Sequence, residues 1–140
     1  MVIGFDLDGV LCDINVVELC LIGQDLSIDQ WYYKERKPLL NPAMFLSDDD
    51  KYIILTAREK RLDEITKKWI DRFLPGAKWF SIYTGGGSRA QEFGKKIARK
   101  KLEILKREKV EIYFDDNATV IKEFRKICKS IKFVQFGGRL

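Results

Sequence analysis

Carboxylate and hydroxyl side chains follow three short apolar runs of this 140-residue chain. They are Asp6, Asp8, Thr56, Asp115 and Asp116. If the apolar runs are parallel strands, these side chains meet at one edge of the sheet, because parallel strands expose their carboxyl ends together. Carboxylates brought so close repel each other unless a hard cation lies between them, and Mg²⁺ takes oxygen ligands and is commonly completed by a substrate phosphate. The pattern therefore predicts a Mg²⁺ site at this edge.

The first of these positions is ambiguous when it is considered alone. Asp6 and Asp8 are two residues apart, so in extended geometry both side chains project to the same side. The alternative is a solvated turn in which the acids and Gly9 merely end the strand. The recurrence of polar residues at later strand ends favours the functional interpretation.

A lysine is predicted on the apolar face of a later helix. Residues 89–108 have helical periodicity, and at 100° per residue Lys101 falls in the middle of the apolar side chains. Those side chains are Phe93, Ile97, Ala98, Leu102, Ile104 and Leu105. A lysine in this position either extends its stem to water or meets a negative partner, such as a carboxylate or a bound phosphate.

Strands and helices are expected to alternate along the chain. Apolar runs predict five strands, at 1–5, 51–55, 79–83, 110–114 and 131–136. Apolar residues at intervals of three and four predict helices between the later strands, including one that ends before Pro75. This alternation predicts an α/β fold, a Rossmann-like three-layer sandwich with a mostly parallel five-stranded sheet. The glycine-rich residues 84–88 are expected to form a loop at the same edge as Asp6, with little functional weight.

The stretch between the first two strands has room for two or three short helices. Asp13 is expected to cap the first, which ends at Gly23. Ser27 and Gln30 have the spacing of a capping box for the second. The second helix carries three consecutive aromatic residues, Trp31, Tyr32 and Tyr33. They are expected either to pack on the surface or to form a small lid that faces the substrate.

Composition limits the chemistry that the chain can perform. The sequence has no histidine, which excludes serine–histidine and cysteine–histidine catalysis and leaves acid–base steps to carboxylates. Its three cysteines have no C-x-x-C spacing, so neither a disulfide framework nor a zinc site is indicated. The length suits one domain, and no apolar run approaches the roughly 20 residues needed to span a bilayer. Because the amino terminus is predicted to be a strand and not a signal peptide, the expected location is cytoplasmic.

The net charge of +5 is distributed unevenly along the chain. Residues 1–50 hold 10 acidic and 3 basic side chains, whereas residues 89–109 hold 9 basic and 3 acidic ones. The basic stretch is either a solvated helix face or a surface for an anionic partner.

The four motifs, in this order, resemble those of the haloacid dehalogenase (HAD) superfamily. Phe-Asp-Leu-Asp-Gly-Val-Leu at 5–11 is similar to its first motif, and Ile-Leu-Thr-Ala-Arg at 54–58 to its second. Lys101 resembles the third motif, although Lys95, Lys96 and Lys100 lie nearby, and 114–117 resembles the fourth. The resemblance covers the whole Rossmann-like core and implies a phosphatase, because the dehalogenases of the superfamily lack an acid at the position of Asp8.

The resemblance also implies roles for the catalytic side chains. Asp6 is expected to be the nucleophile that forms an aspartyl-phosphate, and Asp8 the acid and then the base. Thr56 is expected to donate a hydrogen bond to a phosphoryl oxygen, and Lys101 to neutralise charge on the phosphate and on Asp6. The residues expected to contact the substrate are Thr56, Ala57, Arg58 and Lys101.

For the metal ion, the same resemblance implies a definite set of ligands. Magnesium is expected to be held by the carboxylate of Asp6, the main-chain carbonyl of Asp8 and Asp116. Asp115 is expected either to support these ligands from behind or to alternate as a ligand.

The resemblance further implies a single HAD-like catalytic domain over 1–140, with a small helical cap insertion at about 13–47. So small a cap leaves the site open. A nucleotide or another small phosphate ester is the preferred substrate, since Trp31, Tyr32 and Tyr33 could stack on a base as the small caps of 5′-nucleotidases do. The alternatives are a 3′- or 5′-end phosphatase acting on nucleic acid, similar to the phosphatase domains of polynucleotide kinases, or a degenerate module that only binds nucleic acid. A second copy of the chain could supply a lid, and no membrane partner is expected.

Overall fold

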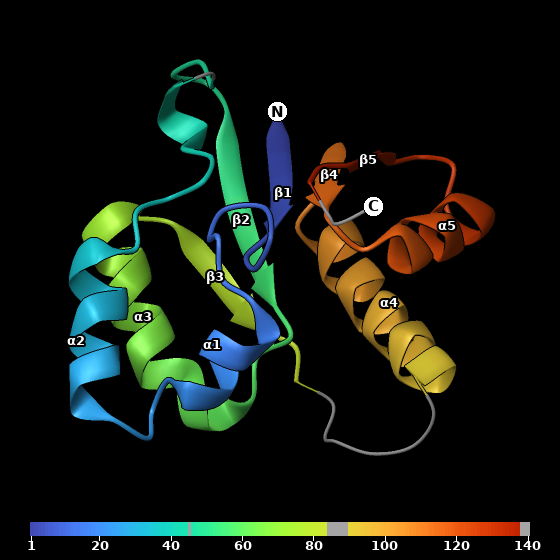
Figure 1. Ribbon diagram of the computed structural model, residues 1–140. Helices are drawn as coiled ribbons and strands as arrows, with labels where there is room; N and C mark the ends of the chain where they lie inside the picture. The colour runs from blue at the N-terminus through green and yellow to red at the C-terminus, as the bar shows by residue number, and fades with distance from the viewer. Residues whose placement is uncertain (45, 84–89, 138–140) are drawn as a thin grey trace.

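The fold is built on five strands, all of them parallel (Figure 1). The computed structural model describes residues 1–44, 46–83 and 90–137, with the backbone alone at 16 and 90–93. The sheet has the order β3-β2-β1-β4-β5. The strands are β1 (Val2–Asp6), β2 (Lys51–Thr56), β3 (Lys78–Ser81), β4 (Ile112–Asp115) and β5 (Lys132–Gln135). The predicted α/β fold with a parallel sheet is confirmed, and the loop expected at 84–88 lies outside the described residues.

Helices cover both faces of the sheet, which gives the predicted three layers (Figure 1). Helices α2 (Leu26–Glu35) and α3 (Asp63–Phe73) lie on one side, and α4 (Ala90–Arg107) and α5 (Ala118–Ile127) on the other. Successive residues of β2 point to opposite faces, as a strand requires. Ile54 packs in the core cluster that includes α3, whereas Ile53 and Leu55 pack with α4 and α5.

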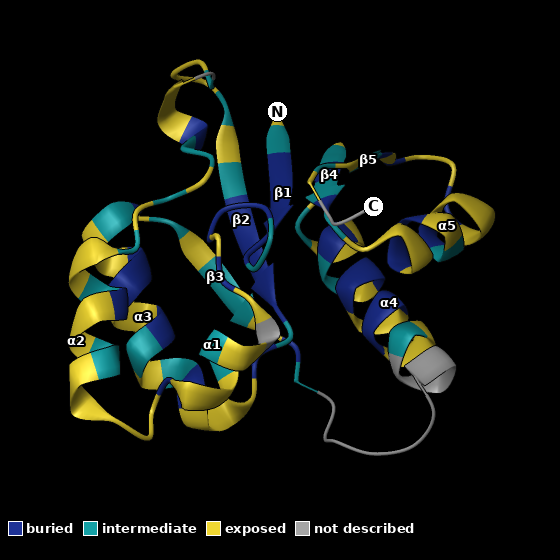
Figure 2. Cartoon of the chain, in the orientation of Figure 1, coloured by how far each residue is buried: buried dark blue, intermediate teal, exposed yellow. Residues whose placement is uncertain are grey.

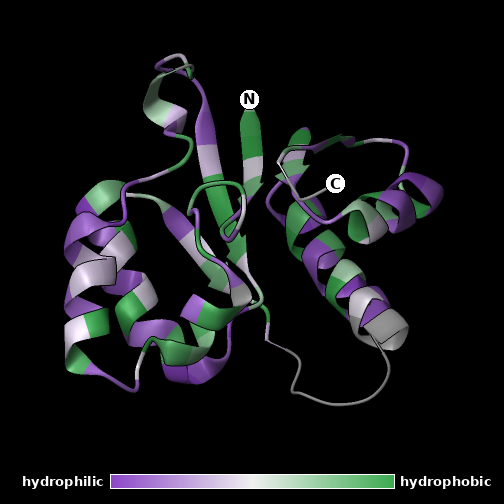
Figure 3. Ribbon diagram, in the orientation of Figure 1, coloured by the Kyte–Doolittle hydropathy of each residue, from purple (hydrophilic) through white to green (hydrophobic). Residues whose placement is uncertain are grey.

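Burial follows this layering closely. Figure 2 shows β1 and the carboxyl half of β2 buried, while the helices expose their outer faces. Figure 3 shows β1 as mostly hydrophobic and the helices as mixed, with hydrophilic residues among the hydrophobic ones. The ring of Phe5 stacks on that of Phe114 in the next strand, with centroids 5.1 Å apart, which fixes β1 against β4. The carboxyl ends of these two central strands are thereby held together.

The stretch between β1 and β2 forms the short helices that were predicted, with different caps. Helix α1 (Val16–Leu21) begins after Asn15 and not Asp13, because Asn15 and Glu18 form a complete capping box. Helix α2 begins after Asp25, whose carboxylate accepts hydrogen bonds from the backbone and hydroxyl groups of Ser27. A single turn of 3₁₀ helix follows at Pro42–Met44. In the described ranges, no helix is long and apolar enough to cross a membrane.

Candidate active site

Three carboxylates converge at the carboxyl edge of the sheet. Asp6 ends β1, and Asp115 ends β4 with Asp116 directly after it. One oxygen from each carboxylate lies within 4.8 Å of the others. The strand register explains the convergence, since Phe5 pairs with Phe114 and both chains then leave the sheet at the same level. Of the four acids expected to meet at this edge, Asp6, Asp115 and Asp116 lie together in this cluster, and Asp8 does not belong to it.

Lys101 of α4 reaches into this cluster. Its Nζ lies 3.1 Å from an oxygen of Asp6 and 2.7 Å from an oxygen of Asp115. The residue is 3% exposed, so its ammonium group meets negative partners and does not extend to water. Its neighbours in the sequence, Lys95, Lys96 and Lys100, are exposed.

The two consecutive aspartates have different surroundings. Both oxygens of Asp115 are occupied, one by Lys101 and the Tyr113 hydroxyl at 2.8 Å, the other by the backbone N–H of Asn117 at 2.9 Å. Asp116 is less buried and packs against the backbone of Gly9. A Cβ at Gly9 would lie 2.1 Å from an oxygen of Asp116, and Gly9 has a φ of +82°, which favours glycine. The close approach needs glycine here and leaves Asp116 the better placed of the two to bind an ion.

Burial and mutual repulsion shift the acidity of these groups. Burial raises the pKa of Asp6 well above its usual value. The negative charge of Asp115 raises this pKa further, by more than the positive charge of Lys101 lowers it. Burial likewise raises the pKa of Asp116. Burial alone would lower the pKa of Lys101, but the carboxylates of Asp115 and Asp6 outweigh it and raise that pKa. Three acids thus share one fixed cation, and the oxygen donor set suits a further hard cation such as Mg²⁺.

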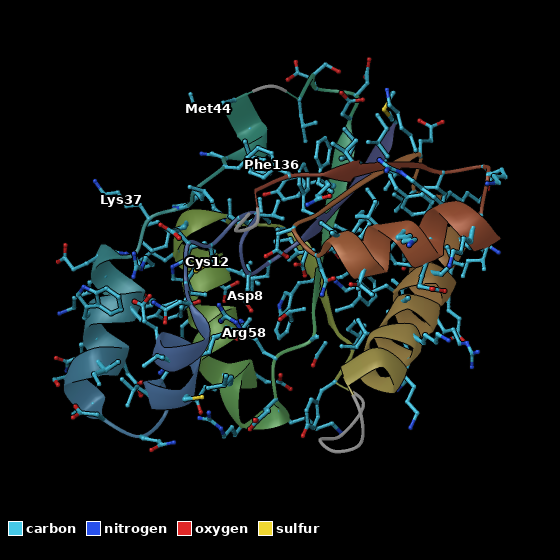
Figure 4. All side chains as sticks on the ribbon, turned by 45° about the vertical axis from the view of Figure 1, so that its right-hand side comes forward. Asp8, Cys12, Lys37, Met44, Arg58 and Phe136 are labelled. Atoms are coloured by element: carbon cyan, nitrogen blue, oxygen red, sulfur yellow. The ribbon has the colours of Figure 1, made fainter. Side chains whose placement is uncertain are left out.

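Asp8 is not part of this group of three carboxylates and lies beside Arg58 (Figure 4). The Nε of Arg58 lies 3.1 and 3.0 Å from the two carboxylate oxygens of Asp8, and its Nη2 donates to the first of them. This two-pronged geometry fixes the plane of the carboxylate as well as its position. The side chain of Asp8 is 24% exposed, whereas that of Arg58 is 2% exposed, so the carboxyl group of Asp8 can face a substrate while the guanidinium behind it is closed off from solvent.

The remaining nitrogen of Arg58 is fixed from two helices. Its Nη1 donates to the hydroxyl of Tyr32 at 2.8 Å and to that of Thr66 at 3.0 Å. Tyr32 is fully buried and stacks on Trp69 of α3, with ring centroids 6.0 Å apart. Burial also raises the pKa of the neighbouring Cys12 thiol to about 12, so this thiol stays neutral at physiological pH. With all its groups engaged, the Arg58 guanidinium is committed to Asp8, and its expected contact with the substrate stays a prediction.

A hollow of about 1310 Å³ opens onto these residues. From the sheet and α4 it is lined by Asp6, Asp8, Gly9, Ala57, Arg58, Lys101, Asp115 and Asp116. From the stretch after β1 it is lined by Asp13, Glu18, Arg36 and Leu39, among others. Thr56 is 1% exposed just behind, where its hydroxyl accepts a hydrogen bond from the backbone N–H of Arg58 at 3.2 Å. The predicted site residues other than Thr56 therefore all line this one hollow.

The three aromatic residues of α2 do not face this hollow. Tyr32 points into the core, and the Trp31 ring carries the Arg36 guanidinium 4.6 Å above it. Tyr33 pairs in the same way with Arg72 of α3 at 5.4 Å. The expectation that they form a substrate-facing lid finds no support among the described residues that line the hollow.

Two supporting residues were missed by the sequence analysis. Tyr113 lies two positions before Asp115 on β4, so strand periodicity places both on the same face and could have found it. Thr66 interrupts the apolar stripe of α3, and a buried hydroxyl in such a stripe indicates a polar partner.

Comparison with known proteins shows similarity at the level of the fold. No family profile matches the sequence, and no curated protein matches it at a significant level. Three solved structures are similar to this chain. One is a chain of the Pnkp1/Rnl/Hen1 complex, with a TM-score of 0.61 and 22% identity over 99% of this chain and 47% of that one. A chain of the Pnkp1/Rnl/Hen1 RNA repair complex also has a TM-score of 0.61, with 18% identity over 99% of this chain and 43% of that one.

The third similar structure is the HAD domain of the effector protein Lem4 from Legionella pneumophila. It has a TM-score of 0.50 and 11% identity over 97% of this chain and 85% of that one. The chain is thus similar in fold to this HAD domain and to the two repair-complex chains, and it spans less than half the length of the latter two.

Proposed function

We propose that this chain is a Mg²⁺-dependent phosphomonoesterase of the HAD type that works through an aspartyl-phosphate on Asp6. The observation that carries the proposal is the position of Asp6, which ends a buried strand, contacts Lys101 and opens onto the hollow. A carboxylate so placed can attack phosphorus while a fixed cation offsets the charge that accumulates. The proposed catalytic domain comprises 1–140, with the helices at 13–47 as its small cap insertion.

Two chemical steps follow from the positions of Asp6 and Asp8. In the first, an oxygen of Asp6 forms a bond to phosphorus as the bond to the leaving oxygen breaks, and Asp8 gives its proton to that oxygen. In the second, Asp8 takes a proton from water, the water oxygen attacks phosphorus, and the bond to Asp6 breaks. Phosphate leaves, Asp6 is again a free carboxylate, and Asp8 again carries a proton, as it does at the start of the first step.

The surrounding residues orient these two acids and the phosphate. Lys101 neutralises charge on Asp6 and on the phosphate, and the Thr56 hydroxyl, which accepts from Arg58, keeps its proton free to donate to a phosphoryl oxygen. Arg58 holds Asp8 in one orientation. The Ala57 backbone lines the hollow beside them.

Asp6, Asp116 and the main-chain carbonyl of Asp8 would hold the Mg²⁺ ion, with Asp115 supporting them through its bonds to Lys101 and Tyr113. When bound, the ion would draw in a phosphoryl oxygen and offset its negative charge. The clustering of three acids around one lysine, with raised pKa values at Asp6 and Asp116, supports this assignment.

A nucleotide or another small phosphate ester fits an open hollow of this size. A second candidate, a phosphatase for 3′ or 5′ ends of nucleic acid, is favoured by the similarity of the fold to chains of an RNA repair complex. The described lining of the hollow holds no aromatic residue that could stack on a base, which weakens the case for a mononucleotide as the substrate. A module that binds nucleic acid without turnover would not need Asp6, Asp8 and Lys101 so arranged.

Hydrolysis of p-nitrophenyl phosphate tests the proposal. The wild-type chain is expected to release p-nitrophenol with Mg²⁺ and to stop when EDTA removes the ion. Asp6→Asn is expected to be inactive, while Asp71→Asn, an exposed acid of α3, serves as the matched control. Mg²⁺ is also expected to raise the melting temperature of the wild type, because a ligand that binds only the folded state stabilises it. Equal inactivity of wild type and Asp6→Asn, with steeply salt-dependent binding of DNA, would instead identify a binding module.

A further inference from the structure

A second hollow lies beside the active site, on its α5 side. It measures about 530 Å³ and is formed by α5 and the end of β5. Four basic side chains line it, Lys122, Arg125, Lys126 and Lys129, together with Ala118, Ile121 and Gln135. All four basic residues are exposed. None of them belongs to the catalytic set.

This basic hollow is continuous with the active-site edge of the sheet. Gln135 is the register partner of Asp115, so the hollow begins one strand away from the acidic cluster. Helix α5 joins the two, because Asn117 and Thr119 line the active-site hollow while Ala118 lines the basic one. Figure 1 shows α5 leading away from this edge. From Ala118 to Ile127 the helix extends about 14 Å, a distance that a few nucleotides of a strand can span, and Lys129 follows just after its end.

The cationic charge in the hollow is largely unneutralised. In the part of the chain that the structure describes, Lys126 alone of the four is paired with a carboxylate, that of Glu123 at 3.5 Å. The other two ordered side chains donate to backbone carbonyls instead: Arg125 to that of Phe133, and Lys129 to that of Arg125. These bonds order the side chains without cancelling their charge. Lys122 and Lys126, four residues apart, share one face of the helix.

The opposite wall of the active-site hollow has the other sign. Asp13, Glu18 and Arg36 line it from the stretch after β1, which leaves one net negative charge on this wall. Glu18 is paired with Arg36, but Asp13 is exposed with no ion pair among the described residues. An anionic chain that enters the site is therefore repelled from the α1 side and attracted along α5.

We propose that the basic hollow on α5 binds the phosphodiester backbone of a nucleic acid strand whose terminal phosphate lies at Asp6. The inference rests on the proposed phosphatase activity and names its substrate class. A strand carries one negative charge at each nucleotide, so its phosphates can contact successive basic residues along α5. A mononucleotide has no second phosphate to reach this hollow.

Activity against oligonucleotides of increasing length tests the assignment. The substrates are mononucleotides and short single strands that carry the phosphate at the 3′ or the 5′ end, with p-nitrophenyl phosphate as reference. For the wild type, kcat/KM is expected to rise with length over the first few nucleotides and then level off. In Lys122→Gln/Lys126→Gln the ratio of oligonucleotide to p-nitrophenyl phosphate activity is expected to fall. The matched control is Lys67→Gln/Lys68→Gln, two exposed lysines of α3.

Binding gives an independent readout. In proteins that also carry Asp6→Asn, the association constant for a phosphorylated single strand is measured at several salt concentrations. Because Lys122→Gln/Lys126→Gln removes two contacts to the strand's backbone, it is expected to reduce the magnitude of the slope of log K against log salt by about 1.4. Two results would overturn the inference and leave the proposed phosphatase activity standing. One is activity on p-nitrophenyl phosphate with no dependence of kcat/KM on oligonucleotide length, and the other is an equal fall in oligonucleotide activity in both double-lysine variants. Inactivity on every substrate would refute the phosphatase, and the binding slope would then still decide whether α5 contacts the strand.

Discussion

Lys101→Met is expected to destabilise the protein by about 3–5 kcal/mol and to lower its phosphatase activity at least ~100-fold. The lysine is almost fully buried between Asp6 and Asp115, and methionine fills a similar volume without charge. Its loss leaves two buried carboxylates with no cation between them, which is more costly than the loss of an exposed ion pair. Chemical denaturation in EDTA measures the stability change, and p-nitrophenyl phosphate hydrolysis measures the activity.

Two comparisons make this prediction specific. Lys100→Met changes the exposed neighbour on the same helix and is expected to alter stability by less than about 0.5 kcal/mol. Mg²⁺ is expected to raise the melting temperature of Lys101→Met more than that of the wild type, because the ion neutralises the same carboxylates. A Lys101→Met variant as stable and as active as Lys100→Met would contradict the role given to this ion pair.

Arg58→Lys is expected to impair catalysis in a way that depends on the leaving group. Lysine keeps the charge but cannot hold both oxygens of Asp8 and the Tyr32 hydroxyl at once, so Asp8 loses its orientation. With an alkyl phosphate, whose leaving oxygen needs a proton, kcat/KM is expected to fall by about 10²–10⁴. With p-nitrophenyl phosphate, whose leaving group is stable as an anion, the loss is expected to be much smaller. Tyr32→Phe is expected to shift both values in the same direction by less.

This pattern separates two roles for the arginine. If Arg58 instead binds the substrate phosphate, both substrates lose kcat/KM by the same factor, because both carry the same phosphoryl group. A loss of folding alone also affects the two substrates equally. Arg61→Lys is the matched control, since Arg61 follows closely in the sequence but contacts backbone carbonyls and Glu59.

The parts of this site that sequence could predict depend on local patterns. The strand ends at Asp6, Thr56 and Asp115 follow from apolar runs, and Lys101 follows from the periodicity of one helix. The helix caps were less predictable, because Asp13 and Asn15 are both good capping residues and only Asn15 completes a reciprocal pair with Glu18.

The setting of Arg58 could not be predicted from local patterns. Its partners Asp8, Tyr32 and Thr66 are 50, 26 and 8 positions away and belong to different elements. Nothing in the local sequence of the second motif distinguishes an arginine that faces a substrate from one that faces an acid. The inward orientation of Tyr32 has the same origin, since Trp69 of α3 and Arg58 fix it from outside its own helix.

Chemical trapping of the proposed intermediate tests the central claim most directly. Asp8→Asn is expected to let Asp6 take the phosphoryl group from p-nitrophenyl phosphate, which needs no acid, and then to stall because no base activates water. The expected result is a single burst of p-nitrophenol and a peptide containing Asp6 whose mass is higher by one phosphoryl group. Borohydride is expected to reduce the phosphorylated side chain of Asp6, which leaves homoserine at that position. Continued p-nitrophenol release by Asp8→Asn/Asp6→Asn, or a phosphoryl group on a residue other than Asp6, would contradict the account.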